Sequence, residues 1–160
     1  MSDLATVYNT AIVPAYDTLP GRMSSVSATV MLLAIGLQES RLVHRRQIRG
    51  PARGLWQFER DGGVAGVLRH PSTREAARQV CVERAVPAVP GDVYHRLEID
   101  DVLAAAFARL LLWTDAKPLP QLGDEATAWD YYIRNWRPGK PHPGTWPELY
   151  DRALRFGLSL

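Results

Sequence analysis

Glu39 is the residue whose surroundings in the chain best suit acid–base chemistry. It lies in the sequence Gly-Leu-Gln-Glu-Ser at 36–40, close behind the most apolar run of the chain, residues 30–35. A carboxyl group at the edge of an apolar helix is costly to ionise, so we expect its pKa to be raised. A Glu with a raised pKa carries a proton near neutral pH and can act as a general acid. A Glu at a helix end is, by itself, more often a surface residue, so the assignment depends on other segments.

A second segment, Gly54-Leu55-Trp56-Gln57-Phe58, begins fifteen residues after Glu39. Gly54 permits close approach of the backbone to a ligand. Gln57 offers both a donor and an acceptor to sugar hydroxyl or N-acetyl groups. Trp56 and Phe58 alternate along an extended segment and should face opposite sides. One ring could then stack on a sugar while the other fills the core, and core packing is an equally good prediction for Trp56.

These two segments resemble those of the lysozyme-like lytic transglycosylases and goose-type lysozymes. In those families a Glu-Ser pair ends a buried helix, and a Gly-Leu-Met-Gln motif follows at about this distance; here Trp56 replaces the Met. The resemblance covers residues 24–60 well and 124–140 loosely, and it implies a single lysozyme-like catalytic domain over residues 1–160. It also implies that Glu39 is catalytic and that the following residues bind substrate: Ser40, Gly54, Leu55, Trp56, Gln57 and Phe58.

The third segment, residues 129–140, looks like the Tyr-Asn-x-Gly-Pro-Gly motif of lytic transglycosylases. Asn135, Pro138 and Gly139 are in place, and the resemblance makes Asn135 a substrate-binding candidate. In that family the Tyr before the Asn helps to orient the catalytic Glu. Here Arg134 stands at that position, which is a clear departure from the family pattern.

Two tyrosines could take the place of the missing one. Tyr131 lies about one helical turn before Arg134 and is the first choice to hydrogen-bond Glu39, with Tyr132 as the second choice. A tyrosine donor orients a carboxyl group without adding charge, whereas an Arg contact would depress its pKa. Arg134 should therefore point away, towards solvent or towards Asp130 at i−4. Core packing is the alternative role for both tyrosines.

The number of carboxyl groups separates the two reactions that the resemblance implies, both of which cleave the MurNAc–GlcNAc β-1,4 bond of peptidoglycan. In a lytic transglycosylase Glu39 alone protonates the leaving oxygen and then acts as base on the sugar 6-hydroxyl, which gives a 1,6-anhydro product. A hydrolytic muramidase usually needs a second carboxylate to hold water, and Glu59 is the candidate, at a position where goose-type lysozymes carry an Asp. An ion pair with Arg60 is the alternative role for Glu59. The match of Asn135 and the Pro-Gly pair favours the transglycosylase.

Two non-enzymatic functions are alternatives to the glycosidase. The chain could be a non-catalytic structural protein of a phage particle that keeps a lysozyme-like shape. It could also be a glycan-binding module that uses Trp56, Trp136 and Trp146. The variant Glu39→Gln separates these from an enzyme, because a binding protein survives the change and an enzyme does not.

Apolar periodicity, caps and Pro/Gly breaks predict a mainly α fold that positions these residues, and the resemblance implies that this fold is lysozyme-like. A short strand, hairpin or turn at 55–58 is the expected exception near the catalytic Glu. A basic loop at 41–53 flanks the site and would attract anionic groups of the wall, with solvated surface as the alternative. Glycines make 62–66 flexible or tightly turned. Helices are expected at about 3–16, 24–40, 73–85, 97–115, 124–136 and 146–156, with Pro87 and Pro90 as breaks.

Composition limits the other possibilities. The 160 residues carry a formal net charge of +2, too small to imply nucleic-acid binding. A single cysteine, Cys81, excludes an internal disulfide and a Cys-rich metal site, the histidines lack metal-ligand spacing, and no cofactor is expected. No secretory signal is evident, and the apolar run at 30–37 is too short to span a bilayer. We therefore expect a phage endolysin or virion-borne enzyme, a monomer or part of the particle, which reaches periplasmic peptidoglycan by another route from the host cytoplasm.

Overall fold

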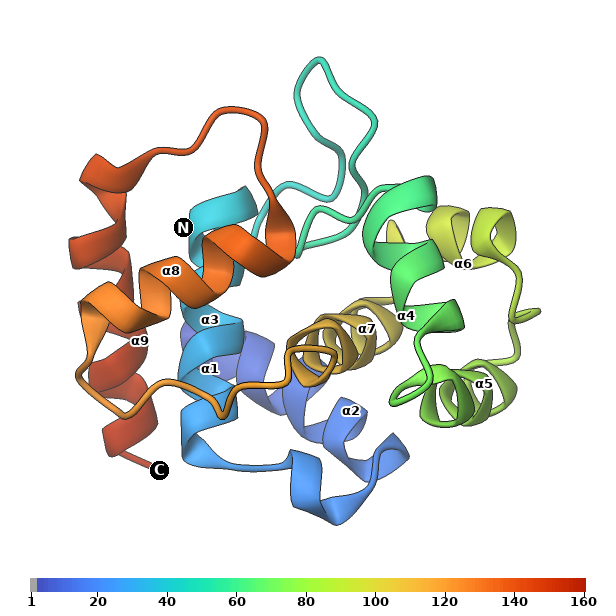
Figure 1. Ribbon diagram of the computed structural model, residues 1–160, viewed down its shortest axis with the longest axis horizontal. Coiled ribbons are helices and arrows are strands. Elements are labelled where there is room, and N and C mark those ends of the chain that lie inside the picture. Colours follow the sequence, from blue (N-terminus) through green and yellow to red (C-terminus); the bar gives the residue numbers. More distant parts are fainter. Residues whose placement is uncertain (1–2) are drawn as a thin grey trace.

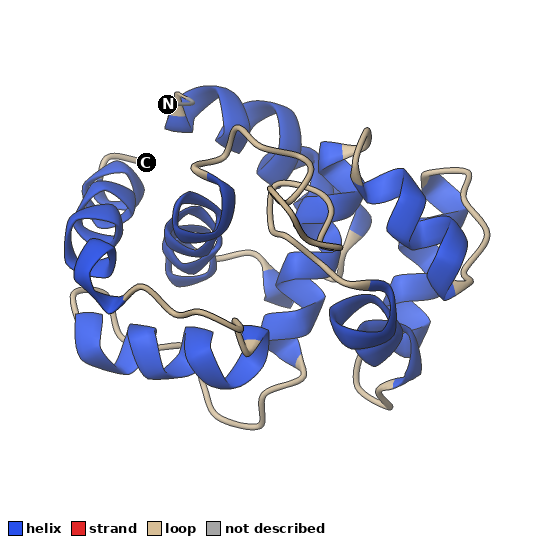
Figure 2. Ribbon diagram, turned by 90° about the horizontal axis from the view of Figure 1, so that it is seen from above, coloured by secondary structure: helices blue, strands red, loops and turns tan. Residues whose placement is uncertain are grey.

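The computed structural model describes residues 3–160, and the elements it contains are helices joined by loops (Figures 1 and 2). The mainly α prediction is therefore confirmed. The elements are α1 Leu4–Val7, η1 Tyr8–Ile12, α2 Val13–Thr18, η2 Gly21–Met23, α3 Val26–Ser40, η3 Arg60–Val64, α4 Ala65–Arg69, α5 Arg74–Glu83, α6 Pro90–Leu97, α7 Asp101–Trp113, α8 Glu125–Trp136, η4 Pro143–Thr145 and α9 Trp146–Leu158.

Helix α3 lies in the core and carries Glu39 in its last turn. Ser25 caps its first turn by accepting a hydrogen bond from the backbone N–H of Ala28 at 3.0 Å, and residues 28–37 are all buried. A helix that is apolar all round must be covered on every side, and α7 and α9 pack against it. Gly157 of α9 allows the close approach, because a Cβ there would lie 2.4 Å from Val30. The core thus fixes where α3 ends.

The predicted helices are present, with three corrections to the sequence-based expectations. The expected helix at 97–115 begins only at Asp101, because Asp100 caps it by accepting from the backbone N–H of Leu103. Pro90 was expected only to break a helix, yet it opens α6, since a proline is well tolerated in the first turn, where its missing N–H costs nothing. Residues 62–66, expected to be flexible or tightly turned, lie in η3 and α4 instead.

The segment between α3 and η3 contains no named strand within the described chain. It holds two isolated antiparallel bridges, Arg46 with Arg53 and Arg53 with Phe58. The residues at 54–57 form a turn, so the turn alternative of the prediction for 55–58 is the one observed. Much of the basic loop is neutralised, because Arg45 pairs with Asp101 and Arg46 with Glu98.

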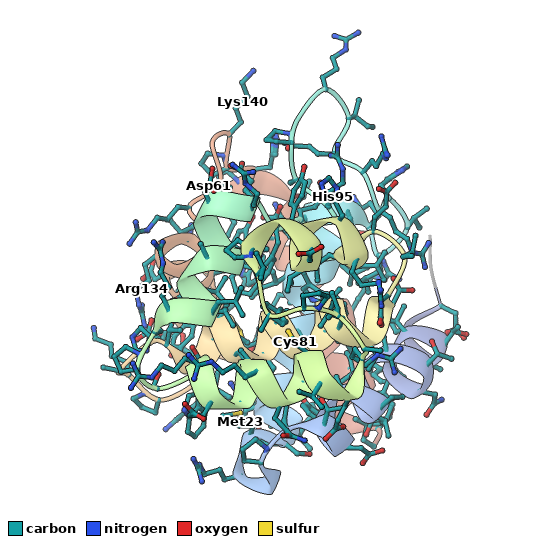
Figure 3. All side chains as sticks on the ribbon, turned by 90° about the vertical axis from the view of Figure 1, so that its right-hand side faces the viewer. Met23, Asp61, Cys81, His95, Arg134 and Lys140 are labelled. Atoms are coloured by element: carbon teal, nitrogen blue, oxygen red, sulfur yellow. The ribbon has the colours of Figure 1, made fainter. Side chains whose placement is uncertain are left out.

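No helix within residues 3–160 is both long and apolar enough to cross a lipid bilayer. Cys81 is buried, as expected for a core thiol, and burial raises its pKa to about 11. Figure 3 places its sulfur inside the helical body, beneath the surface side chains.

Candidate active site

Glu39 is half-buried at the end of α3 and has one hydrogen-bond partner among the described residues. The hydroxyl of Tyr132 donates to its Oε1 across 2.5 Å. Burial raises the pKa of Glu39 to about 7, although the Tyr132 hydrogen bond, which favours the carboxylate, offsets part of that rise. A carboxyl group with this pKa is present in both protonation states near neutral pH. It can therefore give up a proton and take one back.

Tyr132 is held in place by a cluster of aromatic rings. Its ring stacks on that of Trp146, with centroids 5.3 Å apart and an interplanar angle of 4°. Trp129 meets the rings of both Tyr132 and Trp146 edge-on. The indole N–H of Trp146 donates to the carbonyl of Glu125, which fixes the start of α9 against α8. The phenol that reaches Glu39 is thus positioned by rigid packing rather than by a mobile loop.

The contact with Glu39 comes from Tyr132, the second choice from the sequence, and not from Tyr131. The hydroxyl of Tyr131 donates instead towards the carbonyls of Leu112 and Lys117, each at 3.1 Å. Consecutive residues of a helix point about 100° apart, so only one of the two could face α3. Which of the two tyrosines faces α3 depends on the rotation of α8 about its axis. That rotation is set by packing and cannot be read from the sequence.

Arg134 points away from Glu39, as expected, but towards a different partner. Its Nε donates to Asp115 at 2.6 Å rather than to Asp130, and its guanidinium lies 4.5 Å from the centre of the Tyr131 ring. Asp130, one helical turn earlier, was the nearest acid in sequence. Asp115 lies in the loop after α7 and could be recognised only from the tertiary structure.

The second segment is joined to α3 by two hydrogen bonds. Ser40 donates from Oγ to the carbonyl of Leu55 at 2.5 Å, and the indole N–H of Trp56 donates to the carbonyl of Leu32 at 2.8 Å. Ser40 is 4% exposed. Its hydroxyl therefore anchors the turn beside Glu39. Because the side chain is buried, it is poorly placed to contact a substrate.

Trp56 and Phe58 are both core residues, so the predicted alternation is wrong. They are 1% and 3% exposed, respectively, and Leu55 is 1% exposed. Alternation applies to an extended strand, but this segment turns, and Gln57 has a φ of 52°. The turn directs both rings inward. A sugar cannot stack on Trp56 without displacing it from the core.

Gln57 and Gly54 hold the turn in shape. The Gln57 amide donates to the carbonyl of Gly54 at 2.8 Å. Gly54 has a φ of 79°, and a Cβ there would lie 3.0 Å from the carbonyl oxygen of Leu97. A side chain at this position would be strained both by φ and by the crowding. The glycine is needed for packing against the end of α6, whereas the sequence suggested close approach to a ligand.

The side chain of Asn135 is also held by hydrogen bonds within the protein. Its amide nitrogen donates to Asp115 and to the carbonyl of Tyr131, both at 2.8 Å. Together with Arg134 it fixes the loop after α7 to the end of α8. Although burial raises the pKa of Asp115, these hydrogen bonds outweigh it and hold the pKa below its usual value. Only the carbonyl oxygen of the Asn135 side chain is left to accept from another group.

Trp136 connects the third segment to the second. Its indole N–H donates to the carbonyl of Trp56 at 2.9 Å, and its ring meets Phe58 edge-on at 5.8 Å. The three segments singled out in the sequence therefore contact one another around the end of α3. This is the strongest agreement between the sequence analysis and the structure.

Glu59 is exposed, and its carboxyl group takes part in none of the hydrogen bonds or ion pairs of the described residues. The expected alternative, an ion pair with Arg60, is wrong, because Arg60 pairs with Asp61 at 3.1 Å. A free carboxylate at the surface can approach a bound sugar or water, so its role as a second carboxyl group stays a prediction.

Gln38 is a site residue that the sequence analysis missed. Its Nε2 donates to the carbonyl of His142 and its Oε1 accepts from the hydroxyl of Thr145. These bonds tie the last turn of α3 to the loop between α8 and α9, which rises beside the 41–53 loop and carries Lys140 (Figures 1 and 3). In the sequence, only its position directly before Glu39 could have indicated this role. The hydrogen-bond partners of Gln38 lie more than 100 residues away along the chain.

Replacement of Tyr132 by Phe should test its part in setting the pKa of Glu39. The change removes a donor that stabilises the carboxylate, so the pKa of Glu39 should rise further above 7. If Glu39 is a general acid, the alkaline limb of the pH profile of kcat/KM should move to higher pH, with a rate loss of about tenfold from the less ordered carboxyl.

Tyr131→Phe is the matched control, since it removes a neighbouring hydroxyl that bonds only to backbone carbonyls. It should lower stability by about 1 kcal/mol and leave the pH profile unchanged. An alkaline limb that moves with Tyr131→Phe and not with Tyr132→Phe would contradict this arrangement.

No group of three or more His, Cys, Asp or Glu residues in the part of the chain that the structure describes is arranged to hold a metal ion. Comparison of the chain with models of protein families, with curated proteins and with solved structures gives no match. The function must therefore be argued from the site itself.

Proposed function

We propose that residues 1–160 form a single lysozyme-like domain that cleaves the MurNAc–GlcNAc β-1,4 bond of bacterial peptidoglycan, with Glu39 as the catalytic acid. The observation that carries the proposal is the state of Glu39. Its pKa of about 7 results from burial at the end of an apolar helix, and the one side chain among the described residues that hydrogen-bonds to its carboxyl group is the uncharged Tyr132. The three sequence segments that resemble lytic transglycosylases and goose-type lysozymes contact one another around the helix end that carries this residue.

In the proposed reaction, protonated Glu39 transfers its proton to the glycosidic oxygen as the bond to C1 breaks. The carboxylate so formed then removes a proton from the attacking hydroxyl group. Tyr132 donates to Oε1, which leaves Oε2 as the oxygen that exchanges the proton with the substrate. Burial favours the neutral acid, and the Tyr132 hydrogen bond favours the carboxylate, so neither state is too stable to react.

We favour the lytic transglycosylase, in which the attacking hydroxyl is the sugar's own 6-hydroxyl and the product is a 1,6-anhydro sugar. The pKa of Glu39 responds to burial and to Tyr132, and no carboxylate among the described residues perturbs it. A retaining hydrolase would place a second carboxyl group about 5 Å away, where it would raise that pKa. An inverting hydrolase holds the second group farther off, and Glu59 is its candidate.

The products of digestion should separate these two outcomes. We expect wild-type digests of purified peptidoglycan to contain 1,6-anhydro ends, detected by mass spectrometry of the released muropeptides. Glu59→Gln should then change the rate less than about threefold, since exposed side chains away from the reacting atoms contribute little. Glu75→Gln on α5 is the control for the loss of one surface charge, because Glu75 pairs with Arg78 and was not a candidate for the second carboxyl group. Reducing ends as the main product, with their formation suppressed in Glu59→Gln, would establish the hydrolase instead.

The glycan-binding alternative is weakened by the burial of its aromatic residues. Trp56 and Trp146 are 1% and 2% exposed, and only Trp136 of the three proposed rings is partly exposed. A sugar-binding platform needs an accessible ring face. We place the enzyme in a phage, as an endolysin or a component of the virion, where it would act on the host wall.

A further inference from the structure

Arg109, in the middle of α7, is a buried cation without an acidic partner. It is 3% exposed, and the hydrogen bond that it forms runs from Nε to the carbonyl of Met23 at 2.7 Å. Neither Nη atom donates to another described residue, and none of the ion pairs of the described chain includes it. A buried charge normally has a counter-charge or a full set of hydrogen bonds, because desolvation is costly.

Arg109 lines a pocket of about 570 Å³ that Glu39 does not line. The pocket lies between the start of α3, the end of α7 and the loop that follows α7. Arg22 and Arg109 both lie near the ring of Trp113, with guanidinium carbons 5.6 and 5.3 Å from its centre. The two cations thus lie about the same indole and face the same space.

The remaining lining supplies hydroxyl groups, a third cation and an apolar wall. Ser27 has a hydroxyl that bonds to none of the described residues, and Lys117 has a free ammonium group. Apolar side chains from Leu112 and Leu119 complete the wall. The set combines several donors for an oxyanion with a surface for a small hydrocarbon group, which is the usual composition of a ligand pocket.

The one acid of the lining does not neutralise these cations. Asp115 accepts from Arg134 and from Asn135, both on α8 and outside the pocket lining. The pocket lining therefore carries three cationic side chains, and its single carboxylate already forms an ion pair with Arg134. Burial lowers the pKa of Arg109, as expected for a guanidinium that is shielded from water and lacks an acidic partner among the described residues.

We propose that this pocket binds a small organic oxyanion, a carboxylate or a phosphate, between the guanidinium groups of Arg22 and Arg109. The free Nη atoms of Arg109 form the donor fork, Arg22 closes over the anion from the surface, and the hydrocarbon part of the ligand lies against Leu112 and Leu119. The site does not depend on the glycosidase reaction at Glu39.

Isothermal titration calorimetry at constant ionic strength should detect this site with two probes, sodium phosphate and N-acetylalanine, against sodium chloride as reference. We expect saturable one-to-one binding with a Kd on the order of 1 mM for at least one probe. Tighter binding of phosphate would identify a phosphate ligand, and tighter binding of N-acetylalanine would identify a carboxylate with an apolar group. Absence of saturable binding by either probe would overturn the proposal.

Arg22→Gln is the decisive variant, because Arg22 is exposed and its loss should leave the fold intact, as circular dichroism can verify. It should weaken probe binding about tenfold. Arg109→Lys, which keeps the charge but loses the fork, should weaken it as well if the variant folds. Arg49→Gln, with the same loss of charge in the 41–53 loop, is the control and should bind as wild type does. Equal affinity in Arg22→Gln, or equal weakening in Arg49→Gln, would refute a specific site.

Discussion

Replacement of Glu39 by Gln should reduce the cleavage of purified peptidoglycan by about 10²-fold or more. The amide keeps the shape of the side chain and can still accept the hydrogen bond from Tyr132, but it has no proton to give to the leaving oxygen. Loss of turbidity of a peptidoglycan suspension, followed over time at pH 6 to 7, measures the effect.

A control for this variant should not alter a residue that holds the site together. Gln38, the neighbour of Glu39, is unsuitable because its side chain holds the loop between α8 and α9. Glu75→Gln on α5 is better matched, since it removes one carboxylate that pairs only with Arg78. It should lyse peptidoglycan at the wild-type rate. Near wild-type clearing by Glu39→Gln would refute the assignment of the acid and leave the binding or structural alternatives.

The same variant should be more stable than wild type at alkaline pH. The pKa of Glu39 in the folded chain, about 7, lies above its ordinary value of 4.5, so the folded state binds this proton more tightly than the unfolded state does. Below about pH 4.5 the group is neutral in both states and costs nothing. As pH rises from there through 7, the wild type loses stability relative to Glu39→Gln, by about 3 kcal/mol at pH 8. Urea unfolding of both proteins at pH 4.5 and pH 8 measures the difference, and a gap that does not grow with pH would contradict the raised pKa.

Replacement of Trp56 by Ala should lower the free energy of unfolding by about 4 kcal/mol, the largest stability effect that we expect at the site. The indole is 1% exposed, and its N–H donates to the carbonyl of Leu32 in the middle of α3. Its removal leaves a cavity and deletes the hydrogen bond from the indole N–H, and both losses are costly. Urea denaturation followed by far-UV circular dichroism measures the change.

Trp56→Phe is the companion variant, because it keeps most of the ring volume and removes the N–H. It should cost about half as much as the Ala variant. If Trp56 instead served mainly to stack on a sugar, Trp56→Ala would raise KM while leaving the urea midpoint near that of wild type. That result would contradict the burial observed here.

The sequence was sufficient where local chemistry decides the outcome. The apolar run that becomes α3, its Ser25 cap and its end near Glu39 all follow from periodicity and side-chain type. The position of Glu39 beside this apolar run predicted a raised pKa, and burial in the folded chain is the main cause of the rise. The mainly helical class follows from the same patterns.

The tertiary structure decided which residues face Glu39 and which fill the core. Tyr131 and Tyr132 are equivalent in the sequence, and only the packing of α8 against α3 and α9 turned Tyr132 towards the carboxyl group. Trp56 and Phe58 became core residues because a turn with positive φ at Gln57 replaced the extended backbone on which their alternation was predicted. The lack of an acidic partner for Arg109 could not be predicted either, because the sequence does not show which residues surround a cation on an apolar helix. In each case the deciding contact joins residues far apart in the chain, and such contacts are set by the competition of many packed surfaces rather than by local sequence.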